Sequence, residues 1–145
     1  MPDPVMMPMD MARDPTEWIL LYDPDCGFCR WSLGWVLTAD RDRLLRPVGL
    51  GSQEADELLA DMNQEERMAS WHLVSPDGRR WSAGYAAPPL LRLLPAGRAP
   101  AAALAAAPGL TDRVYRWVAD HRSKFSKLIP EAGKRRADER IAARA

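Results

Sequence analysis

The sequence from residue 17 to residue 39 reads EWILLYDPDCGFCRWSLGWVLTA, and its pattern indicates the class of fold. Its first part, residues 17–22, is a compact apolar and aromatic run that is typical of a buried strand. The segment Asp23-Pro24-Asp25 then predicts a sharp turn. From Cys26 to Ala39 the large apolar residues recur at steps of three and four, as on one face of a helix. The stretch therefore predicts a strand, a turn and a helix, with a Cys-x-x-Cys motif where the helix begins.

The segments that follow show both strand and helix patterns. Strands are expected at residues 43–48, 68–74 and 79–82, and helices at residues 52–62, 84–94, 100–107 and 111–128. The turn Pro76-Asp77-Gly78 joins the last two strands into a hairpin. An early β-α-β unit and a later hairpin predict an α/β fold with a mixed four-stranded sheet flanked by helices. This is the layout of a thioredoxin-like domain, here with extra C-terminal helices.

Composition and charge exclude several classes of protein. The 145 residues contain 20 Lys and Arg against 20 Asp and Glu, which argues against a dedicated nucleic-acid binder. No apolar run approaches the roughly 20 residues that cross a bilayer. The first residues also lack the cationic start and apolar segment of a secretion signal. We therefore expect a cytoplasmic chain with no nucleic-acid partner and no membrane insertion.

Cys26 and Cys29 are the only cysteines of the chain. In a reducing compartment, a lone close pair is more often redox-active or metal-binding than a structural disulfide. Cys26 stands where the helix begins, so free backbone N–H groups and the helix dipole favour its thiolate, the attacking species in disulfide exchange. Cys29 lies one turn further on the same side and can resolve the mixed disulfide. Cys26 is thus the expected nucleophile and Cys29 the expected resolving thiol.

Four neighbouring residues have expected roles around this pair. Asp23 is placed to accept the proton of Cys29, directly or through water. Asp25 is expected to cap the helix, and its charge should disfavour the Cys26 thiolate, which implies a reducing couple. Phe28 and Trp31 are candidates for contact with the substrate, although a step of four between Trp31 and Trp35 also fits a core face.

Two alternatives to redox chemistry remain open for the cysteine pair at this point. The cysteines could be small buried thiols without chemistry, or they could form half of a zinc site. Zinc needs four ligands, and the two histidines, His72 and His121, are spaced unlike those of compact Cys₂His₂ modules. We therefore expect no metal and no other cofactor.

The same residues resemble the DCC family of thiol-disulfide oxidoreductases, whose mark is a strand ending in Tyr-Asp followed by Asp-Cys-x-x-Cys. The likeness spans residues 17–127, and its matching positions are Tyr22, Asp23, Asp25, Cys26, Cys29, residues 74–78, Gly84, residues 90–95, Tyr115, His121 and Arg122. It implies a thioredoxin-like fold and disulfide exchange. The expected substrate is a disulfide-containing protein or a small-molecule thiol or disulfide.

Two departures from the family pattern favour an alternative. Pro24 stands where family members usually have glycine, and proline fixes φ near −65° and removes an N–H group. No proline immediately precedes residues 70–74, where a thioredoxin would place a cis-proline. The alternative is a non-catalytic binding or assembly module that retains the fold.

Three regions are expected along the chain. Residues 1–15 contain four prolines and no amphipathic period, which predicts a flexible leader. Residues 16–129 form the thioredoxin-like domain. Residues 130–145 are charged, with Ile141 as the only bulky apolar side chain, which predicts a disordered tail. The sequence contains no signal for an oligomeric state.

Overall fold

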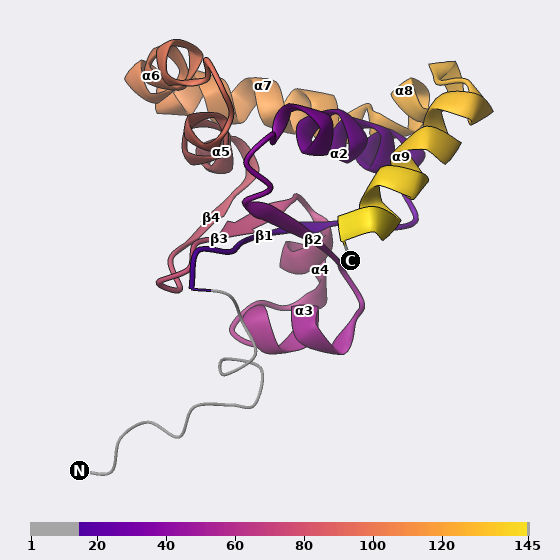
Figure 1. Cartoon of the computed structure of the whole chain (residues 1–145), viewed down its shortest axis with the longest axis horizontal. Coiled ribbons are helices and arrows are strands. Elements are labelled where there is room, and N and C mark those ends of the chain that lie inside the picture. Colours follow the sequence, from indigo (N-terminus) through magenta and orange to yellow (C-terminus); the bar gives the residue numbers. More distant parts are fainter. Residues whose placement is uncertain (1–14, 145) are drawn as a thin grey trace, which may run out of the picture.

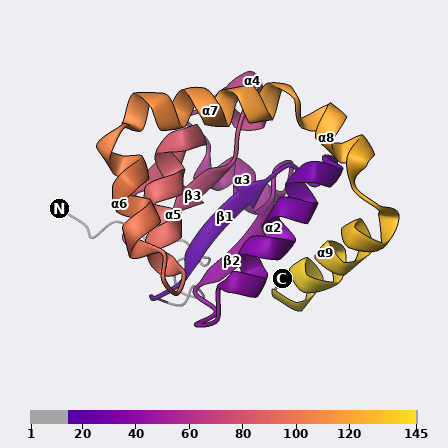
Figure 2. The same ribbon diagram turned by 90° about the horizontal axis from the view of Figure 1, so that it is seen from above.

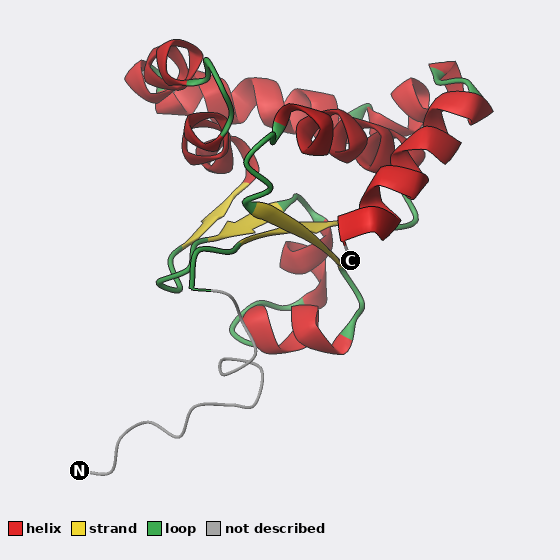
Figure 3. Cartoon of the chain, in the orientation of Figure 1, coloured by secondary structure: helices red, strands yellow, loops and turns green. Residues whose placement is uncertain are grey.

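The computed structural model describes residues 15–144 and builds one four-stranded sheet with helices on both faces (Figures 1 and 3). The predicted leader, residues 1–15, lies outside the described residues except for Pro15. In chain order the elements are β1 (Trp18–Tyr22), α2 (Gly27–Ala39), β2 (Leu45–Gly49), α3 (Gln53–Leu58), α4 (Gln64–Met68), β3 (His72–Val74), β4 (Arg80–Ser82), the 3₁₀ helix η1 (Ala83–Ala86), α5 (Ala87–Leu93), α6 (Arg98–Ala106), α7 (Pro108–Asp120), α8 (Arg122–Leu128) and α9 (Glu131–Arg144).

The sheet has the strand order β2-β1-β3-β4. Strand β1 pairs in parallel with β2, from Trp18 opposite Leu45 to Tyr22 opposite Gly49. It pairs in antiparallel fashion with β3, and β3 in turn with β4. The mixed four-stranded sheet and the thioredoxin-like α/β fold are therefore confirmed.

Alternation along β1 divides the core into two layers. Leu20 faces α2 and α5, whereas Ile19 and Leu21 face the side covered by α3. The first layer contains Leu20, Leu33, Leu37, Leu45, Leu73, Ala86, Leu90 and Ile141. Figure 1 shows α3 and α4 below the sheet and the other helices above it. Among residues 15–144, the helices are all too short or too polar to cross a lipid bilayer.

Several elements differ from the predicted ones. The expected helix at residues 52–62 stops at Leu58, and the expected strand at residues 68–74 shrinks to three residues. Between them, Asn63 accepts a hydrogen bond from Glu66 N–H (2.8 Å) and caps the short helix α4. This local cap outweighs the weak strand pattern that follows it.

The expected helix at residues 111–128 breaks at His121 into α7 and α8. Three of its large apolar side chains do not contribute to the core, because Val114 and Trp117 are more than half exposed and Leu128 is 78 % exposed. The break turns α8 toward the start of α2, so that α8 contacts α2 as well as α7 (Figure 2).

Gly84 fixes the position of α7. Its N–H group donates to the Asp112 carboxylate (3.0 Å). A Cβ atom at this position would lie 2.3 Å from the Asp112 Cα atom, so only glycine allows η1 and α7 to approach this closely. This contact holds the helix that carries Tyr115 above the sheet.

The predicted disordered tail is wrong, because residues 131–144 form helix α9, packed along α2. Small residues make this packing possible, since a Cβ atom on Gly34 would lie only 2.8 Å from the Ala137 Cβ atom. Ala137 and Ile141 are both buried at the contact. The tail thus has a narrow apolar face, although its composition is almost entirely charged or small.

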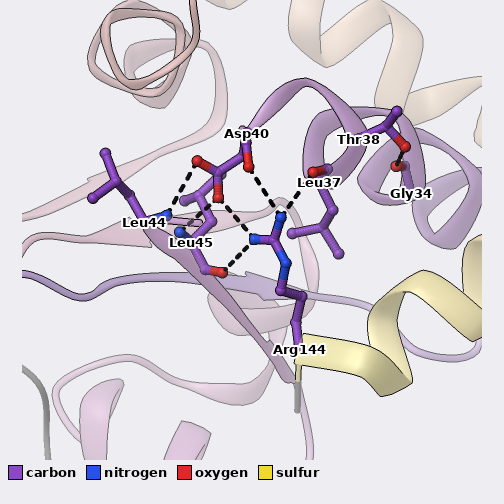
Figure 4. A network of polar contacts seen from close by, with 7 residues as sticks. All are labelled: Gly34, Leu37, Thr38, Asp40, Leu44, Leu45 and Arg144. Carbon is purple, nitrogen blue, oxygen red and sulfur yellow. Dashed lines mark hydrogen bonds and ion pairs between the residues drawn. The ribbon is translucent and has the colours of Figure 1, made fainter. Parts of the chain in front are cut away.

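An ion pair between Arg144 and Asp40 closes this interface (Figure 4). The Asp40 side chain is fully buried at the end of α2, and one of its oxygens lies 2.8 Å from Arg144 Nη1. The same carboxylate accepts the N–H groups of Leu44 and Leu45. The guanidinium also donates to the carbonyl oxygens of Leu37 and Asp40, each at 3.0 Å. Arg144 therefore satisfies carbonyl groups that the helix end leaves free.

Candidate active site

The loop between β1 and α2 is a tight turn that accommodates Pro24. The Cys26 N–H group donates to the Asp23 carbonyl (3.3 Å), and the Asp25 N–H group donates to the Asp23 carboxylate (2.9 Å). Pro24 therefore occupies the second position of a β-turn, where its fixed φ is favourable. The departure from glycine at this position is compatible with a closed turn directly before the cysteines.

Cys26, and not Asp25, is the N-cap of α2. Its backbone is extended, and its Sγ atom accepts a hydrogen bond from the Cys29 N–H group (3.3 Å). The prediction that Asp25 caps the helix is therefore wrong, because the turn ends one residue later than expected. The Asp25 side chain is instead exposed to solvent. The Cys26 sulfur itself thus occupies the position of a capping oxygen.

Ser126 of α8 binds a backbone N–H group in the first turn of α2. Its hydroxyl oxygen accepts the Phe28 N–H group at 2.8 Å, across 98 residues of sequence. The same hydroxyl hydrogen-bonds the Cys26 sulfur. One serine therefore joins the helix terminus to the thiol that lies on it.

The surroundings of Cys26 lower the pKa of its thiol to about 6. The main cause is the hydrogen bond from the Cys29 thiol, which outweighs the opposing effect of burial. The Cys29 N–H group, the positive charge of Arg122 and the Ser126 hydroxyl lower the pKa further. Asp25 is not among the main causes of this shift, because hydrogen-bond donors and a cation outweigh any effect of its charge.

Cys29 has the opposite character. Its pKa is raised, because its proton is shared with the Cys26 sulfur, because its side chain is more deeply buried, and because a negative Cys26 lies beside it. Both cysteines are free thiols with half-buried side chains. At neutral pH Cys26 is therefore mainly a thiolate, whereas Cys29 stays protonated. This difference suits a nucleophile followed by a resolving thiol.

A cavity of about 240 Å³ lies on the Cys29 side of the motif. Its wall is mainly apolar and is formed by β1, α2, the residues before β3, α7 and Arg122. The lining residues are Leu20, Tyr22, Asp23, Phe28, Cys29, Ser32, Leu33, Ser70, Trp71, Tyr115, Val118, Ala119 and Arg122. Cys29 and Asp23 thus open into the same enclosed space.

Asp23 and Arg122 are the charged groups of this lining. One Asp23 oxygen lies 3.9 Å from the Arg122 guanidinium, and the Asp23 side chain is only 11 % exposed. Asp23 also receives the Asp25 N–H group, which fixes its carboxylate at the end of β1. Its role as proton acceptor for Cys29 stays a prediction, with a shared cavity as its structural basis.

The two predicted substrate contacts have different positions. Phe28 lines the cavity, and its ring centre lies 5.3 Å from that of Phe125, so its contact with substrate stays a prediction. Trp31 is not among the lining residues. Its indole packs edge-on against Trp35 (6.3 Å) and lies against Gly133 of α9. Trp31 therefore lies at the interface between α2 and α9, and its contact with a substrate stays a prediction.

Sequence reasoning missed three contributors. Arg122 and Ser126 contribute to the lowered pKa of Cys26, and Tyr115 lines the cavity with its ring 5.5 Å from that of Trp71. Arg122 and Tyr115 were visible only as parts of a family resemblance, without a role. Ser126 had no sequence signal at all, because its partner lies almost the length of the domain away.

The histidines have structural contacts. The buried His72 ring lies between the Ser82 hydroxyl (2.6 Å) and the Arg67 carbonyl (3.0 Å), and burial lowers its pKa. His121 contacts the Trp117 carbonyl through Nδ1 (2.7 Å). Within residues 15–144, no three His, Cys, Asp or Glu side chains are grouped as a metal site would require.

Comparison with known proteins gives one match. The model of a family described as DCC1-like thiol-disulfide oxidoreductase matches residues 20–128. No curated protein and no solved structure gives a significant match to the chain. The matched segment begins within β1 and ends with α8, and therefore contains both cysteines and every residue that lines the cavity.

Proposed function

We propose that this chain, which belongs to the DCC1-like thiol-disulfide oxidoreductase family, transfers electrons between its own Cys26–Cys29 pair and a disulfide substrate. The observation that carries the proposal is the lowered pKa of Cys26 at a half-buried helix start, hydrogen-bonded to a second thiol. Thiolates with pKa values of about 3.5–7.5 are typical of reactive Cys-x-x-Cys motifs. Structural thiols, buried in apolar surroundings, have raised values instead.

The exchange proceeds in two steps. The Cys26 thiolate attacks one sulfur of the substrate disulfide, so that a bond to Cys26 forms, the substrate bond breaks, and one thiolate leaves. Cys29 then loses its proton and attacks the Cys26 sulfur, which forms the Cys26–Cys29 disulfide and releases the second thiolate. The substrate gains two electrons and the protein loses two. A low-molecular-weight thiol or a dithiol protein must then reduce the protein disulfide.

Asp23 is the group that we propose as acceptor of the Cys29 proton. Both residues line the same cavity, so the proton can pass directly or through a water molecule. The thiol of Cys29 has a raised pKa while Cys26 is a thiolate. Once Cys26 enters a mixed disulfide, its negative charge is lost and this part of the effect disappears. Resolution is therefore easier after the first step than before it.

The stabilised thiolate has a consequence for the direction of electron flow. Hydrogen bonds and Arg122 favour the reduced, ionised form of the pair over its disulfide. A couple whose reduced form is stabilised in this way is the more oxidising one. We propose that the protein works in the cytoplasm, where abundant thiols keep the pair reduced between turnovers. The substrate is a disulfide-containing protein or a small disulfide.

The Cys29→Ser variant provides the test of this mechanism. Serine can still donate a hydrogen bond to Cys26 but cannot attack its mixed disulfide, so incubation with oxidised glutathione should leave one glutathione attached to Cys26. Intact-protein mass spectrometry and peptide mapping measure this adduct. Wild type should resolve the same adduct within the mixing time and show an internal disulfide. If the variant instead stays unmodified, or if glutathione attaches to Cys26 only after denaturation, the proposed division of roles is wrong.

A further inference from the structure

The cavity beside Cys29 has a size that suits a single ring. An apolar cavity of about 150 Å³ holds benzene, and this cavity measures about 240 Å³. Sites for drug-sized ligands range from about 300 to 1,000 Å³ and are therefore larger. The space admits one aromatic ring with its attached sulfur and small substituents.

The lining of the cavity is chemically selective. Four aromatic side chains, from Tyr22, Phe28, Trp71 and Tyr115, contribute to its wall. Ring faces and edges attract one another in offset and edge-on arrangements, so such a wall favours an aromatic guest over a polar one. The Arg122 guanidinium adds a cation that can lie over the face of a ring. The Asp23 carboxylate lies 3.9 Å from this guanidinium, so the ion pair between them is a long one.

The backbone groups of Trp71, which lines the cavity, already have hydrogen-bond partners within the chain. The Trp71 N–H group donates to the Tyr115 hydroxyl (3.0 Å), where a bound peptide would otherwise accept it. The Trp71 carbonyl accepts both the Ser70 hydroxyl (3.0 Å) and the Ala83 N–H group (3.3 Å). Addition of a peptide as an extra strand depends on free backbone groups of this kind. Trp71 therefore does not offer its backbone groups for that mode of recognition.

We infer that the cavity binds the aromatic group of a low-molecular-weight disulfide, which is the substrate class of this chain. The inference rests on the proposed function, because it assumes that Cys26 and Cys29 exchange electrons with what the cavity binds. Cys29 forms part of the wall, and its N–H group donates to the Cys26 Sγ atom (3.3 Å). A ring held in the cavity therefore lies against Cys29, which is the direct neighbour of the Cys26 sulfur. The bonds that form and break are those of the two-step exchange, with an aromatic thiol as the product.

Position 118 offers a matched pair of variants for the test. Val118 lines the cavity from α7, whereas Val114, one turn earlier on the same helix, is 55 % exposed. Val118→Trp fills the cavity, and Val114→Trp adds the same side chain to the surface. Ala119→Leu, also in the lining, is a second and milder filling variant in case Val118→Trp does not fold.

The experiment compares two probes, dithiodipyridine and bis(hydroxyethyl) disulfide. For each protein, kcat/KM for the aromatic probe is divided by kcat/KM for the aliphatic one. This ratio is then divided by the ratio of the second-order rate constants with which free glutathione, without enzyme, reduces the same two probes. This corrects for the different leaving groups. We expect a clear aromatic preference in wild type and in Val114→Trp, and a preference roughly 10- to 100-fold smaller in Val118→Trp, with Ala119→Leu between them.

A binding measurement separates the cavity from the chemistry. Methyl phenyl sulfide contains an aromatic ring and a sulfur but cannot undergo exchange. Added to the Cys26→Ser/Cys29→Ser protein, it should shift the indole N–H signal of Trp71, assigned with Trp71→Phe, and the shift should vanish when Val118→Trp is added. An unchanged Trp71 signal together with an unchanged aromatic preference in both filling variants would overturn the inference while disulfide reduction itself continues. Inactivity of wild type toward both probes, with methyl phenyl sulfide still bound, would instead contradict the proposed function.

Discussion

The Cys26→Ser variant is expected to lose disulfide reductase activity to below about 0.1 % of wild type. When catalytic groups act together, removal of the nucleophile lowers the rate on the order of 10³-fold or more. Serine cannot substitute chemically, because a hydroxyl stays protonated at neutral pH and forms no stable bond with sulfur. Reduction of insulin and of bis(hydroxyethyl) disulfide, coupled to glutathione, measures the loss.

The geometry of the site ensures that this loss reports on chemistry and not on unfolding. Cys26 caps α2 through its side chain, and serine is among the best residues at that position. At pH 5, where Cys26 is protonated and its thiolate makes no contribution to stability, the melting temperature of Cys26→Ser should therefore equal or exceed that of the reduced wild type. Equal activity of wild type and variant would support the alternative of a binding or assembly module that retains the fold without catalysis.

The largest effect on stability is expected for Arg144→Ala. The substitution leaves the fully buried Asp40 carboxylate without its cation and leaves the carbonyl groups at the end of α2 without their donor. Removal of one partner from a buried pair costs about 3–5 kcal/mol. We expect the free energy of unfolding to fall by about 3 kcal/mol, at the lower end of that range, because α9 ends at this residue and can yield locally. Urea denaturation followed by circular dichroism measures the change.

Two further substitutions make the result specific. Arg136→Ala removes an exposed arginine from the same helix and should change the free energy of unfolding by no more than about 0.5 kcal/mol. Arg144→Lys keeps the positive charge but loses the planar guanidinium that reaches several acceptors. Its free energy of unfolding should therefore lie between those of Arg144→Ala and Arg136→Ala. If Arg144→Ala is as stable as Arg136→Ala, α9 is not anchored through its last turn.

The local part of the fold could be predicted from the sequence. The apolar run before Asp23 and the helical spacing after Cys26 depend only on neighbours in the chain, and both elements form where they were expected. The exact start of α2 could not be predicted, because Asp25 and Cys26 are adjacent candidates for the same cap. Only the closed turn at Pro24 decides between them, in favour of Cys26.

The distant contacts could not be predicted. Ser126 lies 98 residues from Phe28, and Arg144 lies 104 residues from Asp40, so neither pair leaves a periodic pattern. Helix α9 was missed because its packing depends on the absence of side chains at Gly34 and on the small Ala137, not on bulky apolar residues. A composition dominated by charged and small residues conceals a face of this kind.

The acid–base behaviour of Cys26 follows from the same contacts. The pKa of its thiol is lowered to about 6 in the folded protein, whereas an unperturbed cysteine has a pKa of about 8.5. The fraction of thiolate therefore rises as the pH increases through 6 and is nearly complete at pH 7. The thiolate contributes to the stability of the reduced protein above the unfolded pKa, and this contribution is lost as the pH falls through 6.

The rate of iodoacetamide alkylation of Cys26 in the reduced wild type, measured between pH 4 and pH 10, shows whether Cys26 is a thiolate at neutral pH. Peptide mass spectrometry separates Cys26 from Cys29, whose raised pKa keeps it slow. We expect a single titration of the Cys26 rate with its midpoint at a pH of about 6 and a plateau above pH 7. A midpoint at a pH of about 8.5, or equal rates at the two cysteines, would contradict the account.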